Sequence, residues 1–212
     1  MESSNNCITF SAFYDDSLVT NNLFIKPKFE NRSLASKSWN AIFFSNFGSE
    51  TNNKNSVKSV VVAGNSFINK SETQPAIQFR QYGNGVNPTT GKEMTNSEKI
   101  SKSNITIMDN TFSNCNIHSF PYWNGIEISR NRFYGKSGNG YIEISKNCGG
   151  WRIVENFFER KNHIVLPPSL NKELAWPRFT IAENFARGAV NIENEDIIGK
   201  QYNYFTHKGQ KS

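Results

Sequence analysis

The sequence predicts an all-β fold of stacked strand-and-turn repeats, a β-solenoid, and two observations carry this prediction. The first is a recurring phrase in which alternating apolar or β-branched residues are followed by a short polar pair, an Asn and a Phe. The second is a further short strand after most copies, which gives each repeat at least two strands. The clear copies are VVVAGNSF (60–67), ITIMDNTF (105–112), IEISRNRF (126–133), WRIVENFF (151–158) and FTIAENF (179–185), and weaker ones are LVTNNLF (18–24), IFFSNF (42–47) and QYNYF (201–205).

The spacing of the Asn residues sets the period of the repeat. Successive copies are 24, 19, 45, 21, 25, 28 and 19 residues apart, and the gap of 45 is interpreted as two periods with the strand AIQF (76–79) inside it. Such a period is typical of solenoids, whereas leucine-rich repeats need more Leu and helical repeats need a 3.6-residue pattern. We therefore expect about eight or nine rungs. The Asn positions are Asn22, Asn46, Asn65, Asn110, Asn131, Asn156, Asn184 and Asn203.

Alternation along each strand predicts which side chains point into the stack. The second strands are AIQF (76–79), YIEI (141–144), HIVL (163–166) and AVNI (189–192). Because successive side chains of a strand point to opposite faces and stacked strands lie about 4.8 Å apart, like positions form ladders. The inward positions are then Ile105, Ile107, Ile126, Ile128, Ile142, Ile144, Val190 and Ile192, and the outward ones are Thr106, Glu127, Glu143 and Asn191.

The Asn and Phe of the phrase have a structural explanation at the corner between two strands. Asn tolerates the left-handed backbone region and hydrogen-bonds to its own backbone, so it suits a tight bend. Stacked Asn amides also bond to one another from rung to rung, and the Phe rings stack inside the corner. The alternative is that these amides hold a ligand, which is the less common use of Asn at turns.

The composition describes a thin core under a large polar surface. The chain has 212 residues, a net charge of +6 and a mean hydropathy of -0.59, and its 17 Phe, 7 Tyr and 4 Trp argue against disorder. The basic residues are spread out, as on a solvated, mildly basic surface, and the alternative is an acidic partner such as an anionic polysaccharide; no nucleic-acid site is indicated. Three Cys without a CxxC pair and three isolated His indicate neither a disulfide framework nor a metal site, and we expect no cofactor. No apolar run reaches the roughly 18 residues of a membrane span, and no signal peptide is visible.

The phrases ITIMDNTFSNC, GIEISRNRFYGKSGNGYIEIS and FTIAENF resemble the repeats of the pectin-lyase-like superfamily, over roughly residues 8–205. The resemblance implies a right-handed parallel β-helix, with residues 1–212 as a single domain. It also implies a polysaccharide partner, as in the polysaccharide lyases, glycoside hydrolases and phage tailspikes of this superfamily, and an extracellular or virion location. A homo-oligomer such as a trimer is left open.

The chain departs from this family in two ways. Family members usually begin with a capping helix, whereas CITF (7–10) reads as a strand almost at the first residue, and most catalytic members are longer. An uncovered first rung is an exposed strand edge. We therefore expect a part of a longer protein, or a subunit whose N-terminal rung is uncapped or covered by a neighbour.

No catalytic signature of the family is intact, so the candidate catalytic residues come from outward positions of neighbouring rungs. Glu127 and Arg152 occupy the same slot of successive copies, and Glu143, Lys146 and His163 are expected nearby. A uronide lyase needs a base to remove the proton next to the carboxylate and a cation to hold that carboxylate, and these residue types supply both. The alternative is a cross-strand ion pair on a solvated face.

Two acidic pairs are weaker candidates. Asp15 and Asp16 resemble the paired aspartates of polygalacturonase-like hydrolases, but no His-Gly or Arg-x-Lys accompanies them, and a turn is the alternative. The slot before the Asn reads Asp109, Arg130, Glu155 and Glu183. Its two glutamates would bind a cation or act as acid and base, unless they form a solvated edge.

Aromatic residues are the expected sugar-binding elements, because sugar rings pack their apolar faces on aromatic planes. Several of them lie in segments between strands, such as residues 118–124, 167–177 and the long polar segment 80–103. The alternative for the aromatic residues is a core or loop-anchoring role, since Trp is mostly buried. The expected substrate-binding residues are Arg80, Tyr82, Tyr122, Trp123, Trp151 and Trp176.

These observations lead to two functional hypotheses. The first is a carbohydrate-active β-helix that binds or cleaves an extracellular or capsular polysaccharide by lyase or glycosidase chemistry in a surface groove. The second is a non-catalytic β-solenoid that serves as an adhesin, a receptor-binding segment or a structural segment. Formation of a cleaved product after glycan binding separates the two.

Overall fold

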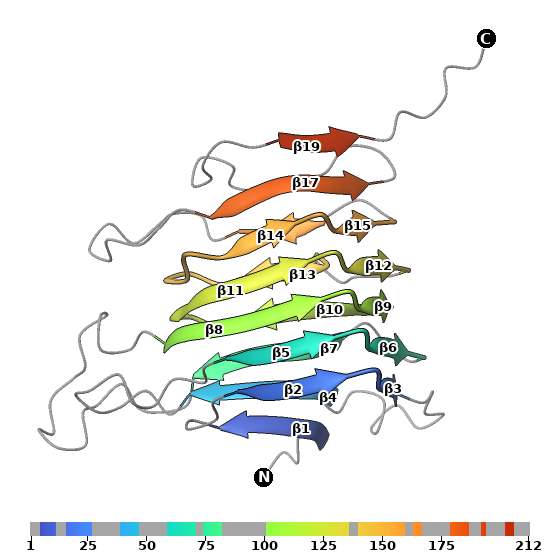
Figure 1. Cartoon of the computed structure of the whole chain (residues 1–212), viewed down its shortest axis with the longest axis vertical. Helices are drawn as coiled ribbons and strands as arrows, with labels where there is room; N and C mark the ends of the chain where they lie inside the picture. The colour runs from blue at the N-terminus through green and yellow to red at the C-terminus, as the bar shows by residue number, and fades with distance from the viewer. Residues whose placement is uncertain are drawn as a thin grey trace, which may run out of the picture.

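The computed structural model of the chain is an all-β stack of parallel strands (Figure 1). It describes residues 5–11, 16–26, 39–46, 59–70, 74–81, 101–135, 140–159, 163–166, 179–186, 192–193 and 202–205, and none of these residues is helical. All pairings between the strands are parallel, as the β-solenoid prediction requires. We call one complete turn of the chain around the stack a coil, which corresponds to a predicted rung. Each of the first five coils contributes one strand to each of three faces, which we call the first, second and third face in chain order.

The strands of each face follow one another up the stack, and β17 runs along both the second and the third face. The first face consists of β1 (Asn5–Ser11), β4 (Trp39–Asn46), β7 (Gln74–Gln81), β10 (Cys115–Ser119), β13 (Ile142–Ile144), β16 (Ile164–Val165) and β18 (Ile192–Glu193). The second face consists of β2 (Ser17–Thr20), β5 (Val60–Ala63), β8 (Ser101–Met108), β11 (Trp123–Ser129), β14 (Arg152–Val154) and β17 (Thr180–Ala186). The third face consists of β3 (Leu23–Lys26), β6 (Ser66–Asn69), β9 (Thr111–Ser113), β12 (Arg132–Tyr134), β15 (Phe157–Phe158) and the end of β17, with which β19 (Tyr202–Phe205) pairs.

A row of asparagines lies at the corner between the second and third faces. The backbone N–H and the Nδ2 of Asn131 both donate to Asn156 Oδ1 at 3.0 Å. Nδ2 also donates to the carbonyl of Ser129, two residues back, at 3.0 Å, and to the carbonyl of Ile107 in the previous coil at 2.8 Å. The same bonds between neighbouring coils confirm the predicted ladder of stacked amides, whose members are Asn22, Asn65, Asn110, Asn131, Asn156 and Asn184.

The predicted spacing of the repeat is wrong in two places. Asn46 ends β4 and lies opposite Gln81 of β7 on the first face, so it is outside the asparagine row. Asn65 donates directly to Asn110 Oδ1, at 2.8 Å from its backbone N–H and 3.0 Å from Nδ2, so the 45-residue gap between these two residues is a single coil. As a result, the described part of the chain places seven strands on the first face, against the eight or nine rungs expected.

The tight corner is made by the residue before each asparagine. This residue has φ near 55° in successive coils, for example 57° at Asp109, 53° at Arg130 and 57° at Glu155. The prediction that Asn itself takes the left-handed conformation is therefore wrong. The asparagine closes the corner with its side chain, and the left-handed residue before it points its own side chain to solvent.

Phe rings stack inside this corner, as predicted, except in the copy at 179–185, whose Phe185 is exposed. The ring centroids of Phe24, Phe67, Phe112, Phe133 and Phe158 follow one another at 5.0, 4.8, 4.7 and 5.2 Å. Aromatic contacts of this kind add about 0.5–1.5 kcal/mol each to the burial of the rings. The corner therefore combines an apolar column with a polar one.

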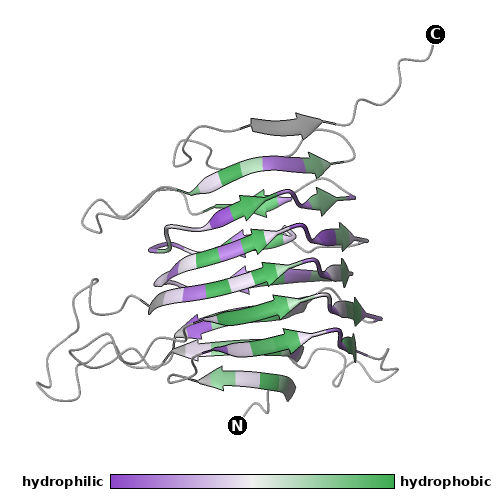
Figure 2. Cartoon of the chain, viewed as in Figure 1, coloured by the Kyte–Doolittle hydropathy of each residue, from purple (hydrophilic) through white to green (hydrophobic). Residues whose placement is uncertain are grey.

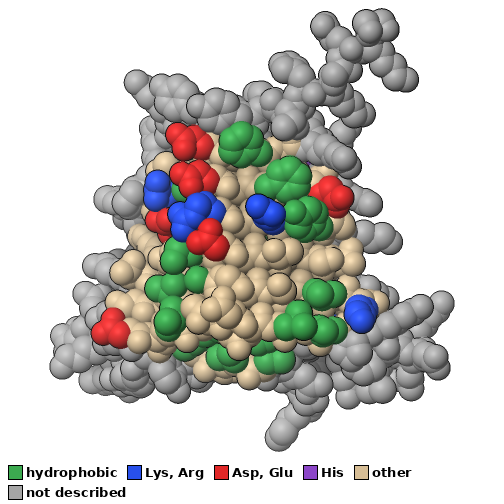
Figure 3. All heavy atoms as spheres, turned by 45° about the vertical axis from the view of Figure 1, so that its right-hand side comes forward, with side chains coloured by type: hydrophobic (Ala, Val, Ile, Leu, Met, Phe, Trp, Pro, Cys, Tyr) green, Lys and Arg blue, Asp and Glu red, His purple; other side chains and the backbone are tan. Residues whose placement is uncertain are grey.

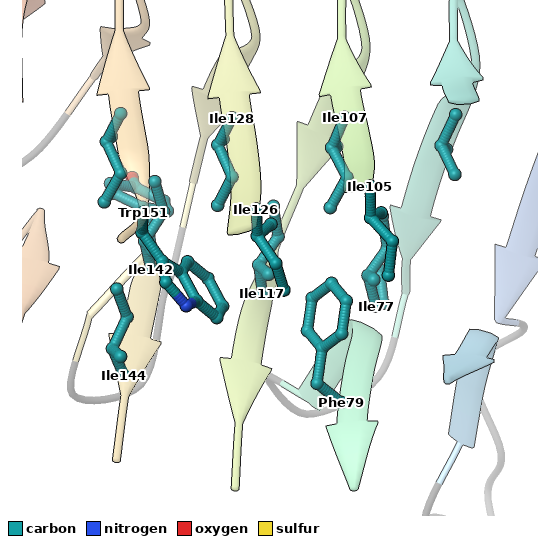
Figure 4. Packing of buried hydrophobic residues seen from close by; sticks show 14 of the residues in the cluster. Ile77, Phe79, Ile105, Ile107, Ile117, Ile126, Ile128, Ile142, Ile144 and Trp151 are labelled. Carbon is teal, nitrogen blue, oxygen red and sulfur yellow. The ribbon is translucent and has the colours of Figure 1, made fainter. Parts of the chain in front are cut away.

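Isoleucine side chains at the alternate, inward-facing positions of the strands fill much of the rest of the interior. Figure 2 shows hydrophobic positions recurring along the strands from coil to coil, and Figure 4 shows the isoleucines of facing strands pointing toward one another. The inward positions predicted from the sequence and described by the structure are buried: Ile105, Ile107, Ile126, Ile128, Ile142 and Ile144. The side chains of Val190, Asn191 and Ile192 lie outside the described residues.

Candidate functional site

The predicted pair of Glu127 and Arg152 forms on the second face. The two residues lie opposite each other in β11 and β14, in a row that continues to Thr106 and Thr180. Arg152 Nη1 donates to Glu127 Oε2 at 3.1 Å, and the side chains are 56% and 32% exposed. This is the solvated cross-strand ion pair that the sequence left as an alternative, and each charge neutralises the other.

The residues directly before the asparagines of the row form a second line of charged side chains, in which neighbouring charges pair. Arg130 donates from Nε and Nη2 to the two carboxylate oxygens of Asp109, both at 2.9 Å, and its Nη1 lies 4.0 Å from Glu155 Oε2. Hydrogen bonding and charge from Asp109 raise the pKa of Arg130 above its ordinary value. The exposed Glu183 follows Glu155 in the next coil, so the slot is a solvated edge. Asp16 is exposed with a φ of 56°, as in a turn, and its predicted partner Asp15 lies outside the described residues.

Glu143 and His163 lie on opposite sides of the first face. Glu143 points outward from β13, whereas His163 is 1% exposed and its ring stacks on Phe158 at 5.2 Å. The expected outer position of His163 is therefore corrected: its ring extends the aromatic column of the corner. Lys146 is exposed just beyond β13.

The tryptophans expected on the surface are in the core. Trp123 is fully buried and Trp151 is 1% exposed, with Trp151 Nε1 donating to the Trp123 carbonyl at 3.0 Å. Both rings meet Phe79 edge-on, at 5.2 and 5.6 Å, and Figure 4 shows Trp151 among the inward isoleucines. This corrects their expected sugar-binding position in favour of the core role left open by the sequence. Tyr122 is half-buried in a turn with a φ of 73°.

Two further predicted substrate-binding residues, Tyr82 and Trp176, lie outside the described residues.

The outer side of the first face brings together a different set of side chains, which we call the first-face site. They come from three consecutive coils, through β7, β10 and β13 and the residues just after β10. In β7 the buried Ile77 and Phe79 place Gln78 and Arg80 on the outer side by alternation, and β10 repeats this pattern around His118. The members of the first-face site are Gln78, Arg80, Asn116, His118, Phe120 and Glu143.

His118 is the centre of this site. It lies opposite Gln78 on one side and Glu143 on the other, in one row across the three strands. Its ring centroid is 4.9 Å from that of Phe120, and Arg80 Cζ lies 5.3 Å from the same Phe120 ring. A half-buried imidazole and an exposed guanidinium thus contact one aromatic side chain, and the carboxylate of Glu143 lies opposite the imidazole in the neighbouring strand.

Glu143 is held in place by a buried amide with an unused acceptor. Asn116 Nδ2 donates to Glu143 Oε1 at 2.6 Å, and the Gly140 N–H donates to the same oxygen at 3.3 Å. Asn116 is 5% exposed, and its Oδ1 receives no hydrogen bond from the described residues. A buried acceptor without a hydrogen bond costs about 1–3 kcal/mol.

The surroundings of His118 favour its neutral form. Partial burial lowers the pKa of His118 below its usual value of 6.5, and the charge of Glu143 opposes this shift as the smaller effect. At neutral pH the imidazole therefore carries a lone pair that can accept a proton.

Comparison of the chain with models of protein families, with curated proteins and with solved structures found no match. Among the described residues, no three His, Cys, Asp or Glu side chains gather closely enough to hold a metal ion. That same part of the chain contains no helix with the length and hydrophobicity that a membrane crossing requires. The function of the first-face site therefore has to follow from the chemistry of its own side chains.

Sequence reasoning assigned Arg80 and Glu143 to a site but not His118. The histidine looked isolated because its partner Glu143 is 25 residues away, and only the pairing of β10 with β13 joins them. The available signal was the alternation in CNIHS (115–119), which places His118 in the outward slot.

Proposed function

We propose that the chain is a right-handed parallel β-helix of the pectin-lyase-like type that binds an acidic polysaccharide on its first face and cleaves it by β-elimination. The observation that carries the proposal is the surroundings of His118. Burial lowers the pKa of His118, and the residue lies opposite Glu143 in the neighbouring strand. His118 and Arg80 both contact the ring of Phe120. A base and a cation are the two groups that elimination from a uronide requires. The described outward side chains of β7, β10 and β13 supply the surface for the ligand, because those of β4, such as Phe43, are buried.

In the proposed reaction His118 removes the proton on the ring carbon next to the sugar carboxylate. The electron pair moves onto the carboxylate, where the positive charge of Arg80 stabilises it. It then forms a carbon–carbon double bond as the bond to the glycosidic oxygen breaks. The leaving oxygen takes up a proton, which the imidazolium of His118 can return.

Elimination is favoured over hydrolysis by the number of carboxylates. Glycoside hydrolysis ordinarily uses two carboxyl groups that flank the scissile bond. Among the described side chains of the first face, Glu143 is the one carboxylate, and its Oε1 already accepts two hydrogen bonds. A histidine base with a guanidinium beside it needs no second carboxylate.

The test compares variants of the first face with variants of the second face. His118→Gln and Arg80→Gln should each lower the formation of unsaturated uronide product from polygalacturonate or alginate by at least about 100-fold, the scale of a lost general base or oxyanion partner. Glu127→Gln and Arg152→Gln, which change the exposed ion pair of the second face, should leave the rate within about threefold. Circular dichroism would check that all four variants keep the β-fold.

Two results would contradict this assignment. If the second-face variants abolish the product and His118→Gln does not, the catalytic group lies on the second face. If the wild-type chain binds acidic polysaccharides without forming product, the alternative of a non-catalytic adhesin or receptor-binding solenoid is favoured.

A further inference from the structure

The third face carries an arginine beside a group of aromatic side chains. Arg132, Phe157 and Phe185 occupy one outer row of β12, β15 and β17, and Tyr134 lies against Phe157 with the ring centroids 5.9 Å apart. We call these four residues the third-face patch. Figure 3, which brings this side of the molecule forward, shows apolar side chains in the upper half between a basic side chain and an acidic one, and a separate cluster of mixed charges beside them.

Arg132 differs from two other arginines of the same region in having no ion-pair partner among the residues that the structure describes. Arg130 is bonded to an aspartate at 2.9 Å and Arg152 to a glutamate at 3.1 Å. The neighbours of Arg132 in its row are Thr111 and Phe157, and no carboxylate among the described residues lies within ion-pair distance of it. The exposed guanidinium of Arg132 is therefore available to an anion from solution.

One aromatic residue of the patch, Phe185, is exposed, and the other two, Phe157 and Tyr134, are half-buried. Phe185 is 41% exposed, although the equivalent inward position of the earlier coils is a buried Phe. The reason is an offset of one residue: the inward position after Asn184 is Ala186, so Phe185 points outward. Apolar side chains gathered on a polar surface mark a binding site more often than chance.

We infer that the third-face patch is a second binding site for acidic polysaccharide, separate from the first-face site. Arg132 would hold a carboxylate or sulfate group through paired N–H donors. The faces of Phe157, Phe185 and Tyr134 would pack against the apolar faces of the sugar rings. The class of ligand rests on the proposed function, while the place of the site rests on Arg132, which has no ion-pair partner among the described residues, and on the exposed Phe185 beside two half-buried rings.

The row also sets the direction of the bound chain. Neighbouring strands lie about 4.8 Å apart, so the row from Arg132 to Phe185 runs along the stack, across the strands. Toward the N-terminal end it continues through Thr111 and Ser66, whose hydroxyl groups offer further hydrogen bonds. A polysaccharide lying along this row would meet an aromatic section first and a hydroxyl-lined section after it.

The experiment measures binding of sodium polygalacturonate, alginate and dextran sulfate to the full chain, with uncharged dextran as the neutral probe. Arg132→Gln should weaken binding of at least one acidic polymer by about tenfold or more, the scale of one lost charge-assisted interaction. Phe157→Leu keeps an apolar side chain of similar burial but removes the flat ring, and should also weaken binding. The matched control is Arg130→Gln, which makes the same change of charge in the same coil and should leave affinity within about threefold.

Several results would overturn the inference. These are binding of none of the acidic polymers, wild-type affinity in Arg132→Gln, equal losses in Arg132→Gln and Arg130→Gln, or equal binding of dextran. The two proposals fail separately. Product that depends on His118, with binding indifferent to Arg132→Gln, removes the third-face site alone. Arg132-dependent binding without any product removes the proposed elimination alone.

Discussion

Replacing Asn131 by Ala tests how much the asparagine row stabilises the protein. Asn131 is fully buried, and its Oδ1 accepts the backbone N–H and the Nδ2 of Asn110, both at 3.0 Å. Its Nδ2 reaches the Ile107 carbonyl of the previous coil at 2.8 Å. The Ala variant leaves the Asn110 N–H without its acceptor and the Ile107 carbonyl without this donor. At about 1–3 kcal/mol for each buried group, we expect the free energy of unfolding to fall by about 2–6 kcal/mol.

Asn22 supplies the matched control at the exposed end of the same row. It makes the same type of bond, from its backbone N–H to Asn65 Oδ1 at 2.9 Å, but its side chain is exposed. Water can replace the contacts of this side chain, so Asn22→Ala should cost less than about 1 kcal/mol. Urea unfolding followed by tryptophan fluorescence and circular dichroism gives both values. Equal losses in Asn131→Ala and Asn22→Ala would refute the reasoning, because burial would then make no difference.

An isosteric change separates the two halves of the amide. Asn131→Asp keeps an oxygen acceptor for Asn110 but removes the Nδ2 donor and places a negative charge near the Ile107 carbonyl and Asn156 Oδ1. A buried charge without a cation is costly, so this variant should be at least as unstable as Asn131→Ala at pH 7. Greater stability of the Asp variant would show that the donor half of the amide contributes little.

Two further predictions concern titrating groups. Activity of the first-face site should fall as the pH drops through the lowered pKa of His118. Glu143→Gln should move this acidic limb of the pH profile to still lower pH, because the charge of Glu143 raises the pKa of His118. Profiles of kcat/KM against pH and NMR titration of His118 check this, and a limb that moves to higher pH would contradict it. Burial raises the pKa of Cys115 to about 12 and that of Cys148 to about 11, so at pH 8 a thiol reagent should modify only the exposed Cys7 until the chain is unfolded; a second thiol that reacts before unfolding would contradict the burial.

Sequence alone predicted the parts of the fold that depend on local pattern. The Asn-x-Phe corners, the stacked amides and the inward isoleucines follow from alternation and turn chemistry, which act over a few residues. The register between coils was harder to predict, because it depends on connections of unequal length. Asn46 looked like a member of the row from its local phrase, but its strand pairs on the first face.

The candidate site shows the same limit more clearly. Arg80 and Glu143 are 63 residues apart in the sequence, and their common place on the first face follows only from the order β7, β10, β13. The sides of two aromatic residues were mispredicted for a different reason: whether Trp123 is buried and Phe185 exposed depends on the alternation of side chains along a strand. A shift of one residue along a strand moves a side chain from the core to the surface, or from the surface to the core. Alternation counted along the sequence assigns side chains to the wrong face wherever a turn or bulge shifts the strand, as between Asn124 and Ile126 in β11.

The unequal lengths of the coils have a consequence for protein engineering. Asn65 and Asn110 are 45 residues apart and Asn110 and Asn131 are 21 apart, yet the bonds within the two pairs are the same. Closing a loop of twice the length costs only about 0.6 kcal/mol more, so a longer connection between two coils destabilises the fold only slightly. The connection between β7 and β8 should therefore accept a grafted peptide, such as an epitope tag, while the layers on either side keep their contacts.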